Sequence, residues 1–328
     1  MQEKLKTDLA DVLKPIEEFL RRVDVEIEEK MKTGVPIIDN SGGHLFKRGG
    51  KKIRASLIIL CSGLKGELPE DVVEIAAAAE IIHAATLIHD DIIDNSEFRR
   101  GDVTVSNKWG SKVAVLVGDY LYTRALEVAV SNNRLDLFPI MVEATKNMVK
   151  GELYQIEYSK VDVVNKEHYF TIIELKTARF LAACAKLGGV KSGYSVEEAE
   201  ALFNFGMNLG YAFQIIDDTL DVMDNGQITG KDTGNDFING KITLPLLHLL
   251  ENTEGERKMF LIESLREPDE GKWQEVQEMV IASGAVEYCI DISRRYLRDG
   301  LGYLSIFPES IYKNVIIDLS RFLLERKY

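Results

Sequence analysis

Residues 75–94 read IAAAAEIIHAATLIHDDIID, a long apolar run that ends in three aspartates. Apolar residues at steps of three and four are typical of a helix. Positions i and i+4 share a helix face, so the spacing places Asp90 and Asp94 side by side. Glu80 and His83 interrupt the run, and no stretch of the chain approaches about 18 uninterrupted apolar residues. We therefore expect a buried helix and no transmembrane segment.

The same helical periodicity recurs along most of the chain. Alternating patterns of the kind that form strands are scarce, and no repeat or linker marks a domain boundary. We predict an all-α fold, with one domain over residues 1–328 built as a single large bundle of about ten or more helices. Pro15 is expected to start or kink a helix, and residues 42–52 are predicted to form a loop before the next helix. The periodic stretches are 70–95, 111–131, 134–157, 166–188, 195–224, 243–251, 272–298 and 309–326.

The composition restricts the functional class. The 53 acidic residues outnumber the 40 basic ones, giving a formal net charge of −13, and this acidity excludes non-specific nucleic-acid binding, which needs a basic surface. Cys61, Cys184 and Cys289 are odd in number and far apart, which indicates buried thiols rather than disulfides or a zinc site. The N-terminal stretch is charged throughout and has no apolar core of a secretory signal. We predict a soluble cytoplasmic protein.

A second aspartate cluster repeats the pattern of the first. Both clusters have the form DDxxD and both follow an apolar helical run. Carboxylates on one helix face repel each other unless a cation lies between them, and Mg²⁺ takes oxygen ligands that it shares with substrate phosphates. A solvated acidic helix end is the alternative for one copy alone, whereas two copies favour metal binding. The two motifs are Asp90, Asp91 and Asp94, then Asp217, Asp218 and Asp221.

Basic residues accompany the two acidic clusters. Diphosphates are bound by arginine forks and lysine point charges. One basic pair alone is more often part of the surface than of a site, but repeated placement beside acidic clusters favours a diphosphate site. The basic residues placed in this way are Lys51, Arg54, Arg99, Arg100, Lys176, Lys231 and Lys241.

Several separated segments resemble, in the correct order, those of the all-trans isoprenyl (polyprenyl) diphosphate synthases, most of all the octaprenyl and other long-chain members. These segments are GGKKIRA (49–55), IIHAATLIHDDIIDNSEFRRG (81–101), VLVGDYLYTRAL (115–126), GELYQ (151–155), LKTA (175–178) and FQIIDDTLDVMDNGQITGKDTGNDFINGKITLP (213–245). The resemblance implies an isoprenoid synthase fold, with helices around a central cavity. It also implies a Mg²⁺-dependent prenyltransferase that condenses isopentenyl diphosphate with an allylic diphosphate.

The resemblance further implies a role for each matching residue. The six aspartates would be the catalytic, metal-binding residues and would hold about three Mg²⁺ against the allylic diphosphate. The side chains that would contact that diphosphate are Arg99, Lys176, Thr177, Gln214, Lys231 and Lys241. Those that would hold isopentenyl diphosphate without metal are Lys51, Arg54, His83 and Arg100. A lone histidine on an apolar helix is usually a core residue, so the resemblance alone assigns His83.

Two positions depart from the pattern of this family. Lys52 and Ala55 stand where an arginine and a proline are usual. Lys52 keeps the charge but loses the bidentate geometry of arginine, so we leave it out of the site. Lys51 and Arg54 are retained.

Small residues before the first motif bear on product length. In this family, a large aromatic residue four or five positions before the first aspartate gives short products, whereas here Ala85 and Thr86 occupy these positions. With Ile82 and Ala79, which lies about 16 Å below Asp90 on the same helix, they are predicted to line an open tunnel for a product of about C40, octaprenyl-like. The alternative is that small residues here only allow close helix packing.

Three alternatives share features of this sequence. A class I terpene cyclase also ionises a diphosphate, but usually lacks the second aspartate cluster and the GGK…R segment. A regulatory subunit of a heteromeric prenyl synthase has typically lost aspartates, and here all six remain. A short-chain (farnesyl or geranylgeranyl) diphosphate synthase is the alternative within the enzyme class. Family members are generally homodimers, which we expect here, with the product passed on to a membrane.

Overall fold

The computed structural model describes residues 8–46, 50–99, 101–131, 134–160, 162, 164–223 and 234–325. The chain divides into two compact units. Unit 1 comprises Met1–Thr145, Ala183–Phe203 and Leu304–Leu319, and unit 2 comprises Lys146–Ala182, Asn204–Tyr303 and Ser320–Tyr328. The single domain over residues 1–328 stays a prediction.

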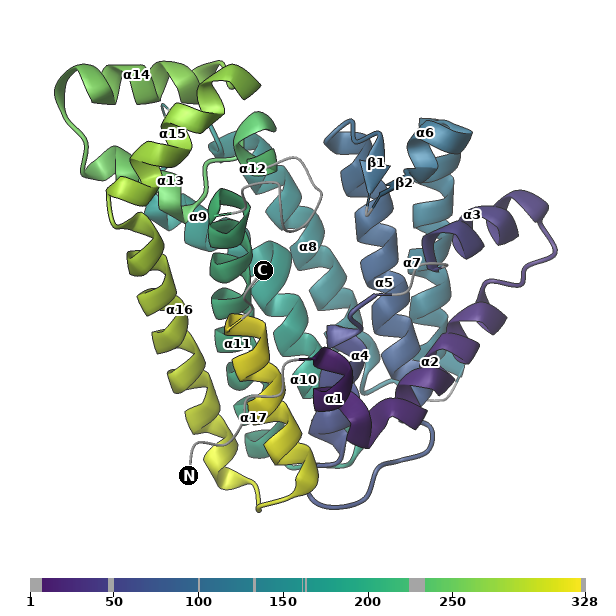
Figure 1. The fold of residues 1–328 in the computed structure, drawn as a ribbon. Coiled ribbons are helices and arrows are strands. Elements are labelled where there is room, and N and C mark those ends of the chain that lie inside the picture. Colours follow the sequence, from purple (N-terminus) through teal and green to yellow (C-terminus); the bar gives the residue numbers. More distant parts are fainter. Residues whose placement is uncertain are drawn as a thin grey trace. The chain divides into compact units, whose positions relative to one another are not determined.

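Most of the described chain is helical, which confirms the all-α prediction (Figure 1). Pro15 lies in a short 3-10 turn that separates the first two helices, as predicted. The elements of unit 1 are α1 (Leu9–Leu13), η1 (Lys14–Ile16), α2 (Glu17–Lys30), α3 (Pro36–Phe46), α4 (Ile53–Ser62), α5 (Val72–Ile93), β1 (Phe98–Arg99), β2 (Asp102–Val103), α6 (Val105–Trp109) and α7 (Ser111–Ser131).

Unit 2 contains the remaining complete helices, and some helices contribute residues to both units. The complete elements of unit 2 are α9 (Lys166–Ile173), η2 (Glu174–Ala178), α12 (Asn235–Ile238), α13 (Leu244–Glu251), α14 (Gly255–Arg266), α15 (Glu270–Ala282) and α16 (Ala285–Gly302). The elements with residues in both units are α8 (Phe138–Tyr158), α10 (Arg179–Lys191), α11 (Val196–Met223), η3 (Tyr303–Ile306) and α17 (Ile311–Leu324). Cys61, Cys184 and Cys289 are buried, as predicted.

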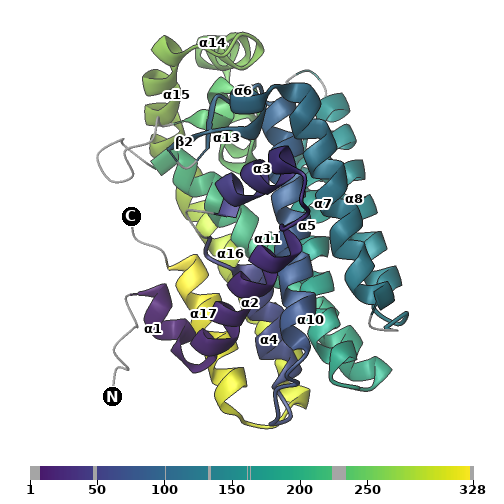
Figure 2. The same ribbon diagram turned by 90° about the vertical axis from the view of Figure 1, so that its right-hand side faces the viewer.

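Helix α5 is the centre of unit 1. It packs against α7, α4 and α2, and Figures 1 and 2 show it running beside α7. Its apolar residues lie on all sides, which is typical of a helix that is buried in a core. By length and composition α5 could also cross a membrane, but 67% of its most apolar stretch is buried inside the protein, as in a core helix.

In unit 2, α11 approaches the segment 178–182 very closely. A Cβ on Gly206 would lie 2.5 Å from the Cα of Ala182, and a Cβ on Gly210 would overlap the Cα of Ala178. Only glycine can therefore occupy these two positions without moving the backbone. This contact fixes α11 beside a segment that begins at the last residue of the LKTA motif.

Two predicted boundaries were wrong. The loop predicted for residues 42–52 is helical as far as Phe46, because α3 begins at Pro36 and continues through the glycines at 42 and 43. The periodic stretch 272–298 is two helices, α15 and α16, because Gly284 adopts φ 77° between them. That left-handed conformation ends a helix and suits glycine.

Candidate active site

Both aspartate motifs lie at the C-terminal end of a helix. In unit 1, Asp94 caps α5, and its N–H donates to the carbonyl of Asp90 at 2.8 Å. In unit 2, α11 ends at Met223, two residues after Asp221. Over its described residues, neither helix has a basic residue in its last turn. Because a helix C-terminus carries partial negative charge, carboxylates there are disfavoured unless a cation joins them.

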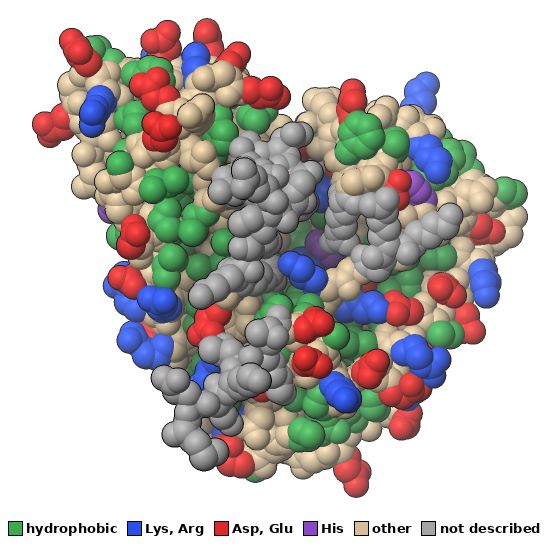
Figure 3. Space-filling view, viewed as in Figure 1, with side chains coloured by type: hydrophobic (Ala, Val, Ile, Leu, Met, Phe, Trp, Pro, Cys, Tyr) green, Lys and Arg blue, Asp and Glu red, His purple; other side chains and the backbone are tan. Residues whose placement is uncertain are grey.

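The middle aspartate of each motif is not part of a solvated acidic surface. Acidic side chains of that ordinary kind gather over α14 and α15 in Figure 3. Glu263 of α14 and Glu275 of α15 are exposed. In contrast, Asp91 is 3% exposed and Asp218 is 5% exposed. A buried carboxylate needs specific partners.

In unit 1, Asp91 is held by an arginine from the hairpin that follows α5. Arg99 lies in β1, which pairs with β2, and its Nε donates to Oδ1 of Asp91 at 2.5 Å. Burial raises the pKa of Asp91, although Arg99 opposes the shift. The structure thus brings Arg99 to the first motif, whereas its contact with a diphosphate stays a prediction. Arg100 lies outside the described residues.

The predicted isopentenyl diphosphate residues Lys51 and Arg54 lie at the start of α4. Between them, Lys52 caps the helix with φ 46°, a left-handed conformation that is costly for a non-glycine residue. The Nζ of Lys52 forms an ion pair with Asp24 of α2. Its side chain is therefore engaged by the protein, in agreement with its omission from the site.

The two polar residues that interrupt the apolar run of α5 differ in environment. The Oε1 of Glu80 accepts the backbone N–H of Ala55 at 3.0 Å, in the first turn of α4. Glu80 thereby holds the start of the helix that carries Arg54. His83 is half-buried, and its carbonyl accepts the hydroxyl of Thr86 at 2.7 Å.

The residues predicted to set product length lie inside unit 1. Ala79, Ile82 and Ala85 are 2%, 1% and 0% exposed, and Thr86 is half-buried. Burial of this kind is expected both of a tightly packed helix and of a tunnel wall. The role of these residues in product length therefore stays a prediction.

In unit 2, the aspartates of the second motif have unequal surroundings. Asp217 is exposed, Asp221 is half-buried and Asp218 is buried. The hydroxyl of Tyr169 donates to Oδ2 of Asp218 at 2.6 Å, and Nε2 of Gln214 donates to Oδ1 at 2.8 Å. Burial raises the pKa of Asp218, against the effect of these two hydrogen bonds.

Lys176 and Thr177 lie in a π-helical turn, η2, between α9 and α10. Such turns are rare and are frequent at functional sites. The Nζ of Lys176 donates to Oε1 of Gln155 at 3.0 Å and forms an ion pair with Glu152. The hydroxyl of Thr177 donates to Oε1 of Gln214 at 2.7 Å. Thr177 is therefore connected to the second motif through Gln214, whereas Lys176 is held by two side chains of α8.

Asp236 adds a further acidic group beside the second motif. Its backbone N–H donates to Oδ2 of Asp221 at 3.1 Å, and its carbonyl accepts the N–H of Lys241 at 2.7 Å. Burial raises the pKa of Asp236, and the carboxylates of Asp218 and Asp221 raise it further. Lys231, which is also predicted to contact the diphosphate, lies outside the described residues.

Four residues at this site were not predicted individually. Glu152 and Gln155 belong to the GELYQ segment, and Asp236 belongs to the long segment around the second motif. Their acidic or amide side chains were therefore visible in the sequence, without a spacing that indicated a partner. Tyr169 lies outside every quoted segment, and its contact with Asp218, 49 residues away, has no local sequence signal.

A cavity of about 170 Å³ in unit 2 brings many of these side chains together. The predicted residues that line it are Lys176, Thr177, Gln214, Asp217, Asp218 and Lys241. Gln155, Tyr169 and Asp236 also line it. The cavity therefore combines carboxylates with two lysines, as a site for a metal-bound diphosphate requires.

The chemistry of these donors fits Mg²⁺. Within the described ranges, no three Asp, Glu, His or Cys side chains converge as a complete ligand set. Mg²⁺ is commonly bound by one or two carboxylates, with water and substrate phosphates completing its coordination. The carboxylates beside this cavity suit such an ion, and the neighbouring lysines suit the phosphates.

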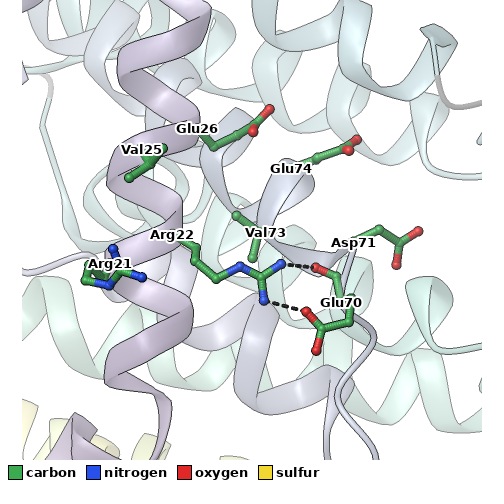
Figure 4. Close-up of a pocket in the computed structure, with 8 residues that line it drawn as sticks. All are labelled: Arg21, Arg22, Val25, Glu26, Glu70, Asp71, Val73 and Glu74. Carbon is green, nitrogen blue, oxygen red and sulfur yellow. Dashed lines mark hydrogen bonds and ion pairs between the residues drawn. The ribbon is translucent and has the colours of Figure 1, made fainter.

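A larger hollow of about 300 Å³ in unit 1 has different chemistry (Figure 4). It lies between α2 and the start of α5, and no predicted ligand lines it. Arg22 donates to Oε2 of Glu70 at 2.5 Å and to the Glu70 carbonyl at 3.0 Å, while Arg21 pairs with Glu18. Its arginines are thus already neutralised by acids of the same unit.

Comparisons with known proteins agree with the arrangement of motifs. The family model described as polyprenyl synthetase matches residues 35–282. The octaprenyl diphosphate synthase of Escherichia coli (strain K12) is 33% identical over 306 residues, covering 93% of this chain and 94% of that protein. A short chain isoprenyl diphosphate synthase of Methanothermobacter thermautotrophicus is 33% identical over 325 residues, covering 98% and 100%. A crystal structure of polyprenyl synthase from Caulobacter crescentus CB15, complexed with calcium and isoprenyl diphosphate, has a TM-score of 0.93 and 33% identity, covering 99% and 100%.

Proposed function

We propose that this chain, which belongs to the polyprenyl synthetase family and is a trans-prenyltransferase, makes an octaprenyl-like product from isopentenyl diphosphate and an allylic diphosphate. The observation that carries the diphosphate chemistry of this proposal is the cavity of unit 2, where Asp217 and Asp218 lie with Lys176 and Lys241. Carboxylates with lysines in one cavity suit a metal-bound diphosphate. The test is incubation with farnesyl diphosphate and radiolabelled isopentenyl diphosphate, followed by chromatography of the dephosphorylated products.

We propose Mg²⁺ as the cofactor, about three ions per active site, held by the two aspartate motifs. When bound, Mg²⁺ would supply positive charge to stabilise the departing diphosphate. Lys176 lines the cavity, and Gln155 and Glu152 hold its ammonium group, so a bound diphosphate would compete with Glu152 for it. In unit 1, Lys51, Arg54 and His83 would bind isopentenyl diphosphate without metal.

The reaction follows from this charge arrangement. The allylic C–O bond breaks as the diphosphate leaves, and lysine side chains stabilise the charge that develops on it. The double bond of isopentenyl diphosphate attacks the resulting carbocation, and transfer of a proton to the released diphosphate gives a product longer by one isoprene unit. No protein nucleophile takes part in this scheme.

The proposed product length depends on Ala85 and Thr86. Both are small, and neither closes a tunnel as a large aromatic residue would. We expect Ala85→Phe to shorten the product. The matched control is Ala84→Phe, because Ala84 is also buried but points about 100° away around the helix. An unchanged product spectrum in Ala85→Phe would place the end of the tunnel elsewhere.

A short-chain product is the second candidate. It is favoured by the short-chain relative, whose identity to this chain equals that of the octaprenyl relative. The chromatography described above separates the two candidates. Products that stop at farnesyl or geranylgeranyl diphosphate, with isopentenyl diphosphate in excess, would replace the long-chain proposal.

We also propose a cytoplasmic homodimer. One face of α8 carries a stripe of apolar side chains, Val149, Leu153 and Ile156, which are 49%, 61% and 54% exposed. A contiguous exposed apolar stripe is typical of a protein–protein contact. We expect Leu153→Glu to give a monomer in sedimentation experiments, whereas Met259→Glu, at an equally exposed position on α14, should leave the oligomer unchanged.

A further inference from the structure

Asp218 differs from the other aspartates of its motif in how the protein holds it. Its side chain is 5% exposed, and each of its two oxygens accepts a hydrogen bond from a protein side chain. Asp217, one residue earlier, is exposed to solvent. A carboxylate with both oxygens engaged by neutral donors is well suited to fix a helix in place.

Tyr169 is a fixed donor to this carboxylate. It is 3% exposed and belongs to the apolar core of unit 2, together with Ile215 and Val222 of α11. The ring is therefore held by packing, and its hydroxyl lies 2.6 Å from Oδ2 of Asp218. A hydrogen bond to a charged acceptor at this distance is among the stronger ones in proteins.

The second donor is oriented by a further residue. Oε1 of Gln214 accepts the hydroxyl of Thr177 at 2.7 Å, so the Nε2 amide group faces Oδ1 of Asp218. The hydrogen bonds thus run from Thr177 through Gln214 to Asp218, where the bond from Tyr169 meets them. The network joins α9, η2 and α11 at one carboxylate.

We propose that Tyr169 is a positioning residue for magnesium diphosphate binding, and that it acts by anchoring Asp218. Anchoring this residue fixes the last turns of α11, and with them the directions of Asp217 and Asp221. The anchor is needed because three carboxylates at a helix C-terminus repel one another and the helix end. This inference rests on the proposed function, since it concerns the same metal-bound diphosphate.

The test uses Tyr169→Phe, which removes the hydroxyl and keeps the ring. The matched control is Tyr211→Phe, because the hydroxyl of Tyr211 donates to Oε2 of Glu174 at 2.7 Å in the same unit. Inorganic diphosphate is titrated calorimetrically into each protein, with and without Mg²⁺. We expect Tyr169→Phe to weaken the Mg²⁺-dependent part of binding about tenfold or more and to leave the metal-independent part unchanged. Tyr211→Phe should change neither part.

Kinetics give a second measurement. In Tyr169→Phe, the Mg²⁺ concentration for half-maximal turnover and the KM for the allylic diphosphate should rise together, while the KM for isopentenyl diphosphate stays constant. Excess Mg²⁺ should restore much of the turnover, because the ligands are misplaced rather than removed. A uniform loss of kcat that excess Mg²⁺ does not restore would overturn the proposal.

A pair of near-isosteric variants tests the anchor directly. Asp217→Asn should weaken Mg²⁺-dependent diphosphate binding more than Asp218→Asn, whose effect should match that of Tyr169→Phe. The reverse ranking, or equal losses in Tyr169→Phe and Tyr211→Phe, would overturn the inference. Absence of any Mg²⁺-dependent diphosphate binding in the unaltered protein would instead overturn the proposed function, and the inference with it.

Discussion

The two aspartate motifs each contain a buried carboxylate, and the protein stabilises the two carboxylates in different ways. In unit 1, the buried middle aspartate, Asp91, is held by the guanidinium of Arg99. In unit 2, the buried middle aspartate, Asp218, is held by the neutral donors Tyr169 and Gln214. One carboxylate therefore has a counter-charge within the protein, whereas the other has hydrogen bonds only.

This difference indicates how strongly each motif depends on added cations. An arginine compensates part of the negative charge at the end of α5 in the absence of metal. The two donors that hold Asp218 are neutral and give it no formal counter-charge, and Asp236 adds a further carboxylate nearby. We expect the second motif to have the greater need for Mg²⁺, and the variants below test this difference.

The largest expected effect comes from the first aspartate of each motif. Asp90→Ala and Asp217→Ala should each lower turnover about 1,000-fold, or about 4 kcal/mol in activation free energy. Single-turnover rates over a range of Mg²⁺ concentrations should show the greater loss of Mg²⁺ affinity in Asp217→Ala. Glu275→Ala, an exposed acid on α15, is the control. Near-normal turnover in either aspartate variant would contradict the metal assignment.

A smaller effect is expected at the glycine that brings α11 against the LKTA segment. A Cβ at Gly210 would overlap the Cα of Ala178, and backbone atoms cannot move aside cheaply. Gly210→Ala should therefore lower the free energy of unfolding by about 3 kcal/mol and displace the second motif. Chemical denaturation measures the loss. A change below about 1 kcal/mol would show that the backbone of this segment yields easily.

The helices and the two motifs could be predicted from the sequence more completely than the long-range contacts that hold them in place. Helical periodicity and the DDxxD spacing are local properties, so α5 and α11 could be located from neighbouring residues. The contacts of Tyr169 with Asp218 and of Glu80 with Ala55 join residues 49 and 25 positions apart, and they depend on tertiary packing. The π turn at Lys176 also had no signal, since four of its five residues are good helix formers.

Removing Arg99, the partner of Asp91, should lower the free energy of unfolding by about 2 kcal/mol. Arg99→Gln leaves Asp91 buried without its counter-charge, but the arginine is 32% exposed, so the loss is below the roughly 3–5 kcal/mol of fully buried pairs. Tyr169→Phe, its counterpart in unit 2, should cost about 1 kcal/mol. Adding Asp91→Asn to Arg99→Gln should restore most of the stability in urea denaturation. If it does not, Arg99 stabilises unit 1 through other contacts.

The smallest effect is expected at Gly118 in unit 1. This glycine lies against the helix of the first motif, whereas Gly210 is part of the helix of the second. A Cβ at Gly118 of α7 would overlap Nε2 of His89, which is the far end of a side chain rather than backbone. The imidazole can rotate away, losing its contact with the carbonyl of Val115 at 3.2 Å, so Gly118→Ala should cost less than about 1 kcal/mol.

Comparing Gly118→Ala with Gly210→Ala distinguishes a side-chain contact at the first motif's helix from a backbone contact at the second motif's helix. If Gly118→Ala costs as much as Gly210→Ala, His89 is fixed between α5 and α7, and the first motif is held as rigidly as the second. If the costs differ as expected, the end of α5 tolerates side-chain rearrangement beside Asp90. The end of α11, in contrast, depends on direct backbone contact. The first motif, which has Arg99 as a partner, then tolerates a small displacement of its helix. The second motif, which we expect to depend more on Mg²⁺, lies on the more rigidly fixed helix.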